Sequence, residues 1–98
     1  MNKDELLTRT LDELRQRYPI GLYEFLFRHR PDLYKQLLDL EDRIDRAFLS
    51  GTVGELKAVL RDYWRLHMQA IEEFKKINQL GLNLLKAREE MLGERVRA

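Results

Sequence analysis

The fold is decided by residues 31–77, PDLYKQLLDLEDRIDRAFLSGTVGELKAVLRDYWRLHMQAIEEFKKI, where two apolar patterns flank a short turn. Large apolar residues recur three or four positions apart on both sides of Ser50-Gly51-Thr52. This spacing places their side chains on one face of a helix. Because so few residues separate the two patterns, we expect the two helices to pack against each other as an antiparallel hairpin.

Capping residues mark the limits of the first helix of this hairpin. Pro31 suits the first position of a helix, and the charge of Asp32 complements the helix dipole there. The helix is expected to end at Ser50, with Gly51 as a left-handed cap. Thr52 and Glu55 then have the spacing of a capping box, which starts the second helix.

The second helix is expected to be unusually long. Its apolar face runs for six turns as far as Ile77 and then weakens, because Asn78 and Gly81 fall on the same face. We expect a break at about 78–82 and a last helix over about 83–92; one continuous helix over 53–92 is the alternative. Even as far as the break the helix spans about 40 Å, whereas a compact chain of this length is roughly 33 Å across.

Two shorter helices are predicted ahead of the hairpin. Asn2 and Glu5 form a capping box for a helix over about 3–17. Pro19 is expected to open a second helix, over about 19–29. On a helical wheel the apolar residues of this second helix fill a wide arc that includes Tyr23 and Phe27, and Phe25 falls outside it.

The composition fits one all-α domain over residues 1–98. The chain has 98 residues, 44% hydrophobic and 36% charged, a net charge of +1 and no cysteine. The fold expected is a small antiparallel bundle of four helices, with a core over about 1–80 and with residues 83–92 as a fifth helix or an extension of the fourth. The expected core comprises Leu7, Leu11, Leu14, Tyr23, Phe27, Leu37, Ile44, Phe48, Leu56, Tyr63, Phe74 and Ile77.

No catalytic or metal-binding motif stands out. The only serine, Ser50, lies in a turn, and His29 and His67 fall in different helices. Glycine-rich phosphate loops and paired metal ligands are lacking. We therefore expect a non-enzymatic protein without cofactor or metal. The N-terminus has no basic stretch leading into an apolar one, which argues against a signal peptide. The longest nearly uncharged run, residues 18–27, is about half a membrane span, so no membrane association is expected and the cytoplasm is the expected location.

His67 is the most unusual polar residue, because it lies in the middle of the apolar face of the long helix. A buried imidazole usually satisfies its hydrogen bonds within the core. The alternative is a pH-sensitive group at an interface, since histidine titrates near neutral pH.

Spare apolar residues favour a protein partner. Phe25 lies outside the main arc of its helix, and the 31–50 helix carries a second, weaker stripe. The last predicted segment is rich in leucine. The expected function is a protein–protein interaction module, homodimeric or a subunit of a larger assembly. Its expected interface is Phe25, Tyr34, Leu38, Leu49, Leu84, Leu85 and Leu92.

Nucleic-acid binding is the alternative function. Arg15 and Arg17 precede the aromatic helix, and Arg28 and Arg30 follow it. Arginine beside aromatic rings can contact phosphates and stack on bases. A net charge of +1 is far from the strongly basic surface of such domains, so this function is the less favoured one.

Overall fold

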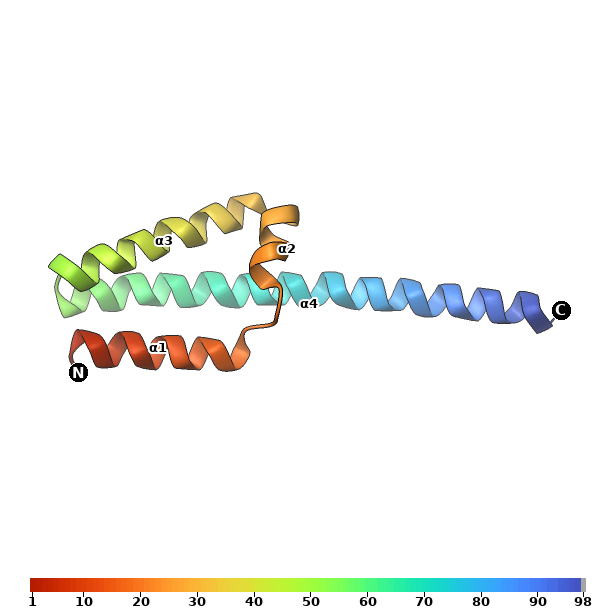
Figure 1. Ribbon diagram of the computed structural model, residues 1–98, viewed down its shortest axis with the longest axis horizontal. Helices are drawn as coiled ribbons and strands as arrows, with labels where there is room; N and C mark the ends of the chain where they lie inside the picture. The colour runs from red at the N-terminus through yellow and green to blue at the C-terminus, as the bar shows by residue number, and fades with distance from the viewer. Residues whose placement is uncertain (98) are drawn as a thin grey trace.

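The computed structural model describes residues 1–97, with side chains described as far as Gly93, and this part of the chain contains helices and no strand. The helices are α1 (Lys3–Arg17), α2 (Leu22–His29), α3 (Pro31–Ser50) and α4 (Val53–Arg97) (Figure 1). The expected all-helical class, with four helices of which the fourth is long, is therefore confirmed.

The N-cap half of each predicted capping box is present. The Asn2 side-chain oxygen accepts a hydrogen bond from the Glu5 backbone N–H at 2.8 Å. The Thr52 hydroxyl oxygen accepts one from the Glu55 backbone N–H at 3.1 Å. Each bond satisfies a backbone donor that the first turn of a helix otherwise leaves without a partner, so α1 and α4 begin where the sequence predicts.

Two boundary predictions are wrong. Pro19 does not open α2, because residues 19–21 form a turn in which the Leu22 N–H donates to the Pro19 carbonyl at 3.3 Å. Gly21, with a φ of 85°, supplies the left-handed conformation that this turn needs. Gly51 has an extended backbone rather than a left-handed one, and its N–H closes α3 by donating to the Ala47 carbonyl at 3.0 Å.

The first half of α4 is the centre of the packed region. Helices α1, α2 and α3 all contact it, and α2 also contacts α3. We call this region, residues 1–74, the head. Figure 1 shows α1 and α3 along opposite sides of α4 in this view, with α2 crossing near the middle of α4. The buried apolar side chains are Leu14, Leu22, Phe25, Leu26, Leu33, Leu37, Leu40, Ile44, Ala47, Leu56, Leu60, Tyr63, Leu66, Ala70 and Ile71.

Of the twelve residues predicted for the core, five are buried, five are partly buried and two are exposed. Phe27 and Ile77 are exposed, whereas Phe25, expected outside the arc, is only 8% exposed. The turn at Gly21 fixes the orientation in which α2 enters the head. As a result α2 packs through Leu22 and Phe25. This stripe is rotated about the helix axis relative to the apolar arc that the sequence predicts. Ile77 is exposed because the head ends just before it.

Helix α4 is continuous, so the expected break near Gly81 is wrong and the alternative holds. A polar residue on an apolar face disfavours a helix only where that face packs. Among the described residues, nothing packs on the second half of α4. A single glycine costs only about 1 kcal/mol of helix stability. The molecule is consequently elongated, 70 × 24 × 15 Å, with a radius of gyration of 19.2 Å, against about 13 Å for a compact chain of this length.

Replacing a fully buried leucine of α3 should destabilise the head strongly. Leu37→Ala, at a side chain that is 0% exposed, is expected to lower the free energy of unfolding by about 2–5 kcal/mol. The neighbouring Leu38→Ala, at a largely exposed side chain, should change it by about 0.5 kcal/mol or less. Urea unfolding followed by circular dichroism checks both; equal effects would contradict the placement of α3.

Candidate functional site

The second half of α4 has no covering element. All side chains from Lys75 to Gly93 are exposed, and we call this stretch the tail segment. Although it is rich in leucine, none of the helices in the described residues offers a stretch long and apolar enough to cross a membrane. An uncovered, leucine-bearing helix of this kind is typical of a surface that packs on another helix.

The apolar residues of the tail segment form one stripe. At 100° per residue, five of them fall within about 80° of each other around the helix. They are Ile77, Leu80, Leu84, Ala87 and Met91, which we call the seam. Leu85 and Leu92 lie beside the seam and widen it.

The seam continues the face that α4 buries in the head. Leu56, Tyr63 and Ala70 are seven residues apart and all buried. The next residues at this spacing are Ile77, Leu84 and Met91, which are exposed by 45%, 72% and 61%. A seven-residue apolar repeat keeps one face of a helix toward a partner helix. Helix α4 therefore carries one packing face along its length, and the head covers only the first half.

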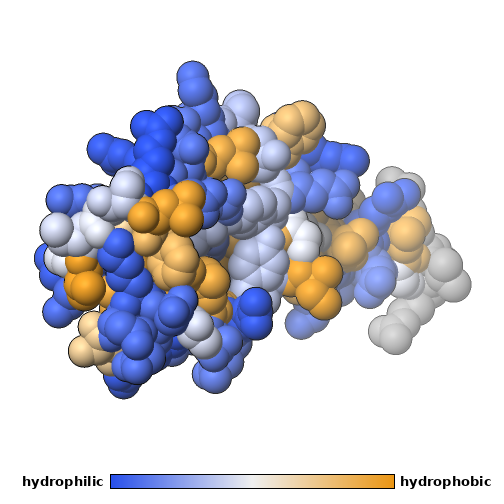
Figure 2. Space-filling view, turned by 60° about the vertical axis from the view of Figure 1, so that its left-hand side comes forward, coloured by the Kyte–Doolittle hydropathy of each residue, from blue (hydrophilic) through white to orange (hydrophobic). Residues whose placement is uncertain are grey.

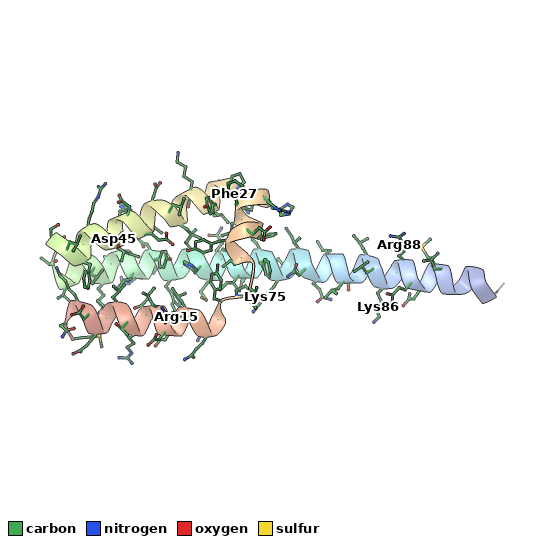
Figure 3. The ribbon with its side chains drawn as sticks, viewed as in Figure 1. Arg15, Phe27, Asp45, Lys75, Lys86 and Arg88 are labelled. Carbon is green, nitrogen blue, oxygen red and sulfur yellow. The ribbon has the colours of Figure 1, made fainter. Side chains whose placement is uncertain are left out.

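Charged residues border the seam. Lys76 lies on its edge at the start of the tail segment, and Glu90 lies near its end on the same side. Figure 3 shows Lys86 and Arg88 on opposite sides of α4, as the helical period requires. Arg88 borders the seam, whereas Lys86 lies far from it. An apolar stripe bordered by charged residues resembles protein interfaces, which have an apolar centre and a polar rim.

Three of the expected interface residues belong to this surface. Leu84 lies in the seam, and Leu85 and Leu92 lie beside it. The sequence interpretation missed Ile77, which was assigned to the core, and Leu80. The signal that could have found both is the seven-residue spacing that leads from Tyr63 through Ala70 into the tail segment.

The remaining expected interface residues lie in the head and do not join this surface. Phe25 is buried, with its ring edge-on to Phe74 at 5.2 Å, so the head itself uses it. Tyr34 is half-buried against the rings of Tyr23 and Phe27. Leu38 and Leu49 are exposed on α3. Figure 2 shows hydrophobic side chains as separate patches among hydrophilic ones on the face of the head turned to the viewer.

A polar cluster lies inside the head, where α2, α3 and α4 meet. The hydroxyls of Tyr23 and Tyr63 both donate to Oε1 of Glu41, at 2.7 and 2.8 Å. His67 Nδ1 donates to the Tyr63 carbonyl at 3.0 Å, because a carbonyl oxygen can only accept. His67 Nε2 faces the Tyr23 hydroxyl at 3.3 Å. The cluster thus ties one residue of α2 and one of α3 to two of α4.

Burial dominates the electrostatics of this cluster. It lowers the pKa of His67 below the usual 6.5, since a charged imidazole loses water there. It also raises the pKa of Tyr23 and that of Tyr63 well above the ordinary range, and the Glu41 carboxylate that their hydroxyls contact adds to both shifts. At neutral pH the imidazole and both phenols are therefore neutral. In this buried polar cluster Glu41 accepts from both phenols, and the imidazole donates through Nδ1.

A groove of about 510 Å³ lies between α3 and α4 and is separate from this cluster. Its lining runs from Arg43 and Arg46 to Asp62 and includes the small residues Ala47 and Gly51. It contains no histidine, and its two carboxylates, Glu55 and Asp62, are two turns apart on α4. In the described residues, no group of three or more histidine, aspartate or glutamate side chains is placed to hold a metal ion.

The arginines of the nucleic-acid alternative all have partners within the chain. Arg15 lies 3.6 Å from Asp12, and Arg28 lies 2.9 Å from Glu24. Arg17 stacks over the Trp64 ring at 5.3 Å. Arg30 pairs with both Asp32 and Glu73 and so ties the start of α3 to α4.

Comparison with known proteins adds no assignment. A scan against protein-family models, a search of curated proteins and a search of solved structures found no match to this chain. Its function must therefore be inferred from the surface and the cluster described above.

Removing the shared acceptor of the cluster should weaken the head. Glu41→Ala leaves two tyrosine hydroxyls without their acceptor, which is expected to lower the free energy of unfolding by roughly 1–3 kcal/mol. Glu41→Gln keeps a carbonyl oxygen that can accept both bonds and should restore most of the loss. Asp39→Ala, at an exposed carboxylate of the same helix, is the control. Equal destabilisation by the Glu41→Ala and Asp39→Ala variants would contradict the cluster.

The buried histidine should make stability depend on pH. Because its pKa is lower in the folded chain than in the unfolded one, the unfolded chain binds the proton more readily. The free energy of unfolding is therefore expected to fall as the pH drops below about 6.5, by up to about 1.4 kcal/mol per pH unit. His67→Gln should flatten this slope, and His29→Gln, at an exposed histidine, should not. Urea unfolding between pH 5.5 and 7.5 measures all three chains.

Proposed function

We propose that this chain is a non-enzymatic protein–protein interaction module that binds another helix through the seam of its tail segment. One observation carries the proposal: the face that α4 buries in the head continues for the rest of the helix without cover. Chains that leave large apolar stripes exposed usually bury them against a partner.

The head serves as the folded support in this proposal. We interpret its helices as an antiparallel bundle that holds the first half of α4 rigid, so that the seam is presented in one orientation. A rigid helix loses less conformational freedom on binding than a flexible peptide does, which favours association. The polar cluster contributes by fixing how α2, α3 and α4 meet. The proposed setting is the cytoplasm.

No second function is favoured. The arginines expected to contact nucleic acid are engaged with Asp12, Glu24, Trp64, Asp32 and Glu73. The head holds no cleft that brings histidine or paired carboxylates together for catalysis among the described residues, because His67 is enclosed in the core.

A polar residue in the seam should weaken association without unfolding the head. Leu84→Gln is expected to raise the dissociation constant at least about tenfold, since a buried leucine contributes about 1.5–3 kcal/mol. Leu82→Gln is the matched control, because Leu82 is 61% exposed but lies on the opposite side of the helix from the seam. Sedimentation equilibrium measures association, and urea unfolding confirms that the head is unchanged.

A photo-crosslinking amino acid at position 84 should identify the partner in the cells that make this protein. We expect one discrete adduct, and none from the same amino acid at position 82. The adduct mass separates a second copy from a different protein. If position 84 gives no adduct in cells and the purified chain does not associate, the proposed function is wrong.

A further inference from the structure

We infer that the partner of the seam is a second copy of this chain, packed antiparallel, so that Leu80 of one copy meets Leu84 of the other. This inference rests on the proposed function and names its partner and geometry. The arrangement is a two-fold symmetric dimer in which the same surface serves both copies.

The seam is complementary to the seam of a second copy when the two helices run antiparallel. In an antiparallel pair of helices with a seven-residue repeat, the two core positions of one helix alternate with those of the other. With the two-fold axis between Leu80 and Leu84, these two residues form the central layers. Ile77 of each copy then packs against Ala87 of the other. Every central layer is apolar, and Gly81 of the two copies meet beside the axis, where the small residue lets the backbones approach.

Charge complementarity selects this geometry. In the same alignment Lys76 of each copy flanks Glu90 of the other, on the edge of the seam. Opposite charges at the edges of such helix pairs set orientation and register. On the other edge Arg88 comes beside the Phe74 ring of the second copy, a position that favours a cation–π contact. Moving the copies by seven residues separates Lys76 from Glu90 and, in one direction, brings Glu73 opposite Leu84.

The head also disfavours a parallel pair. In a parallel arrangement the second copy's own α4 would continue into the space beside residues 56–70, where α1, α2 and α3 already cover this face. The antiparallel arrangement places the two heads at opposite ends of the shared segment. With the axis at position 82, that segment runs from Phe74 to Glu90, about 24 Å of helix.

The contact surface of this dimer is small. Each copy contributes Ile77, Leu80, Leu84 and Ala87, together with the aliphatic stems of Lys76 and Arg88. Surfaces of a few side chains per copy lie at the lower end of specific interfaces. We therefore expect a concentration-dependent dimer and not a permanent one.

A charge-reversal cycle tests the geometry. Lys76→Glu places two carboxylates together at both ends of that edge and should raise the dimer dissociation constant about tenfold at low salt. Glu90→Lys should do the same, and the K76E/E90K double variant should return to within a factor of about two or three of the original. The control pair is Lys75→Glu and Glu89→Lys, which carry the same charge changes away from the seam. Sedimentation equilibrium of the full chain measures each variant.

Disulfide formation gives an independent readout, since the chain has no cysteine of its own. Asn83 lies beside the two-fold axis, so Asn83→Cys should give a covalent dimer under mild oxidation. Leu84→Cys should crosslink instead if the pair is parallel. Leu82→Cys, on the opposite side of the helix from the seam, controls for random collision.

The outcomes separate the inference from the proposed function. Loss and recovery of the dimer in the charge cycle, with crosslinking through Asn83→Cys, supports the inference. If Leu84→Gln weakens the dimer but the charge-reversal variants do not, the antiparallel geometry is wrong. The proposed function is then left intact. A monomer at every concentration overturns the second copy as partner. A photo-crosslinked adduct to a different protein then still supports the proposed function.

Discussion

Burial of apolar side chains around the first half of α4 is the interaction on which the rest of this structure depends. Helix α1 and helix α3 each pack on α4, and α2 packs on both α3 and α4. Leu56 and Ala70, near the two ends of this contact, are fully buried. Because α4 is the common neighbour, a change that removes its packing leaves the other helices with little to bury their own stripes against.

The polar cluster restricts the relative orientation of the helices that this apolar packing brings together. Apolar contacts vary little with small rotations of a helix, whereas hydrogen bonds hold only over a narrow range of distance and angle. Glu41 accepts from tyrosines on two other helices, and His67 donates within α4 itself. The cluster thereby limits how α2 and α3 can turn relative to α4, at the point where Arg30 also joins α3 to Glu73.

The same packing face explains the elongated shape and the proposed association. The head covers α4 only as far as Phe74, since α1 to α3 are too short to follow the rest of the helix. The seam that continues beyond it retains the spacing of a packing surface. A dimer through this seam would give the second half of α4 what the head gives the first, namely apolar neighbours along the whole face.

The sequence by itself determined the helical class, the limits of α1 and α3 and the start of α4. These features depend on local rules: a capping side chain bonds a backbone N–H three residues away, and an apolar period of three to four residues defines a helix. Leu37 and Ile44 could be placed in the core from this period alone. The richness in leucine of the last segment also pointed to the surface now proposed to bind a partner.

Only the tertiary structure decided which faces are covered. Phe25 is buried and Phe27 exposed because the left-handed turn at Gly21 sets how α2 meets the head, and this angle has no local signature. Helix α4 continues through Gly81 because, among the described residues, nothing packs on the helix there. An interpretation of the sequence that expects the apolar face to be packed treats Asn78 and Gly81 on that face as a helix break. Burial is a property of two surfaces that meet, and a sequence pattern describes only one of them.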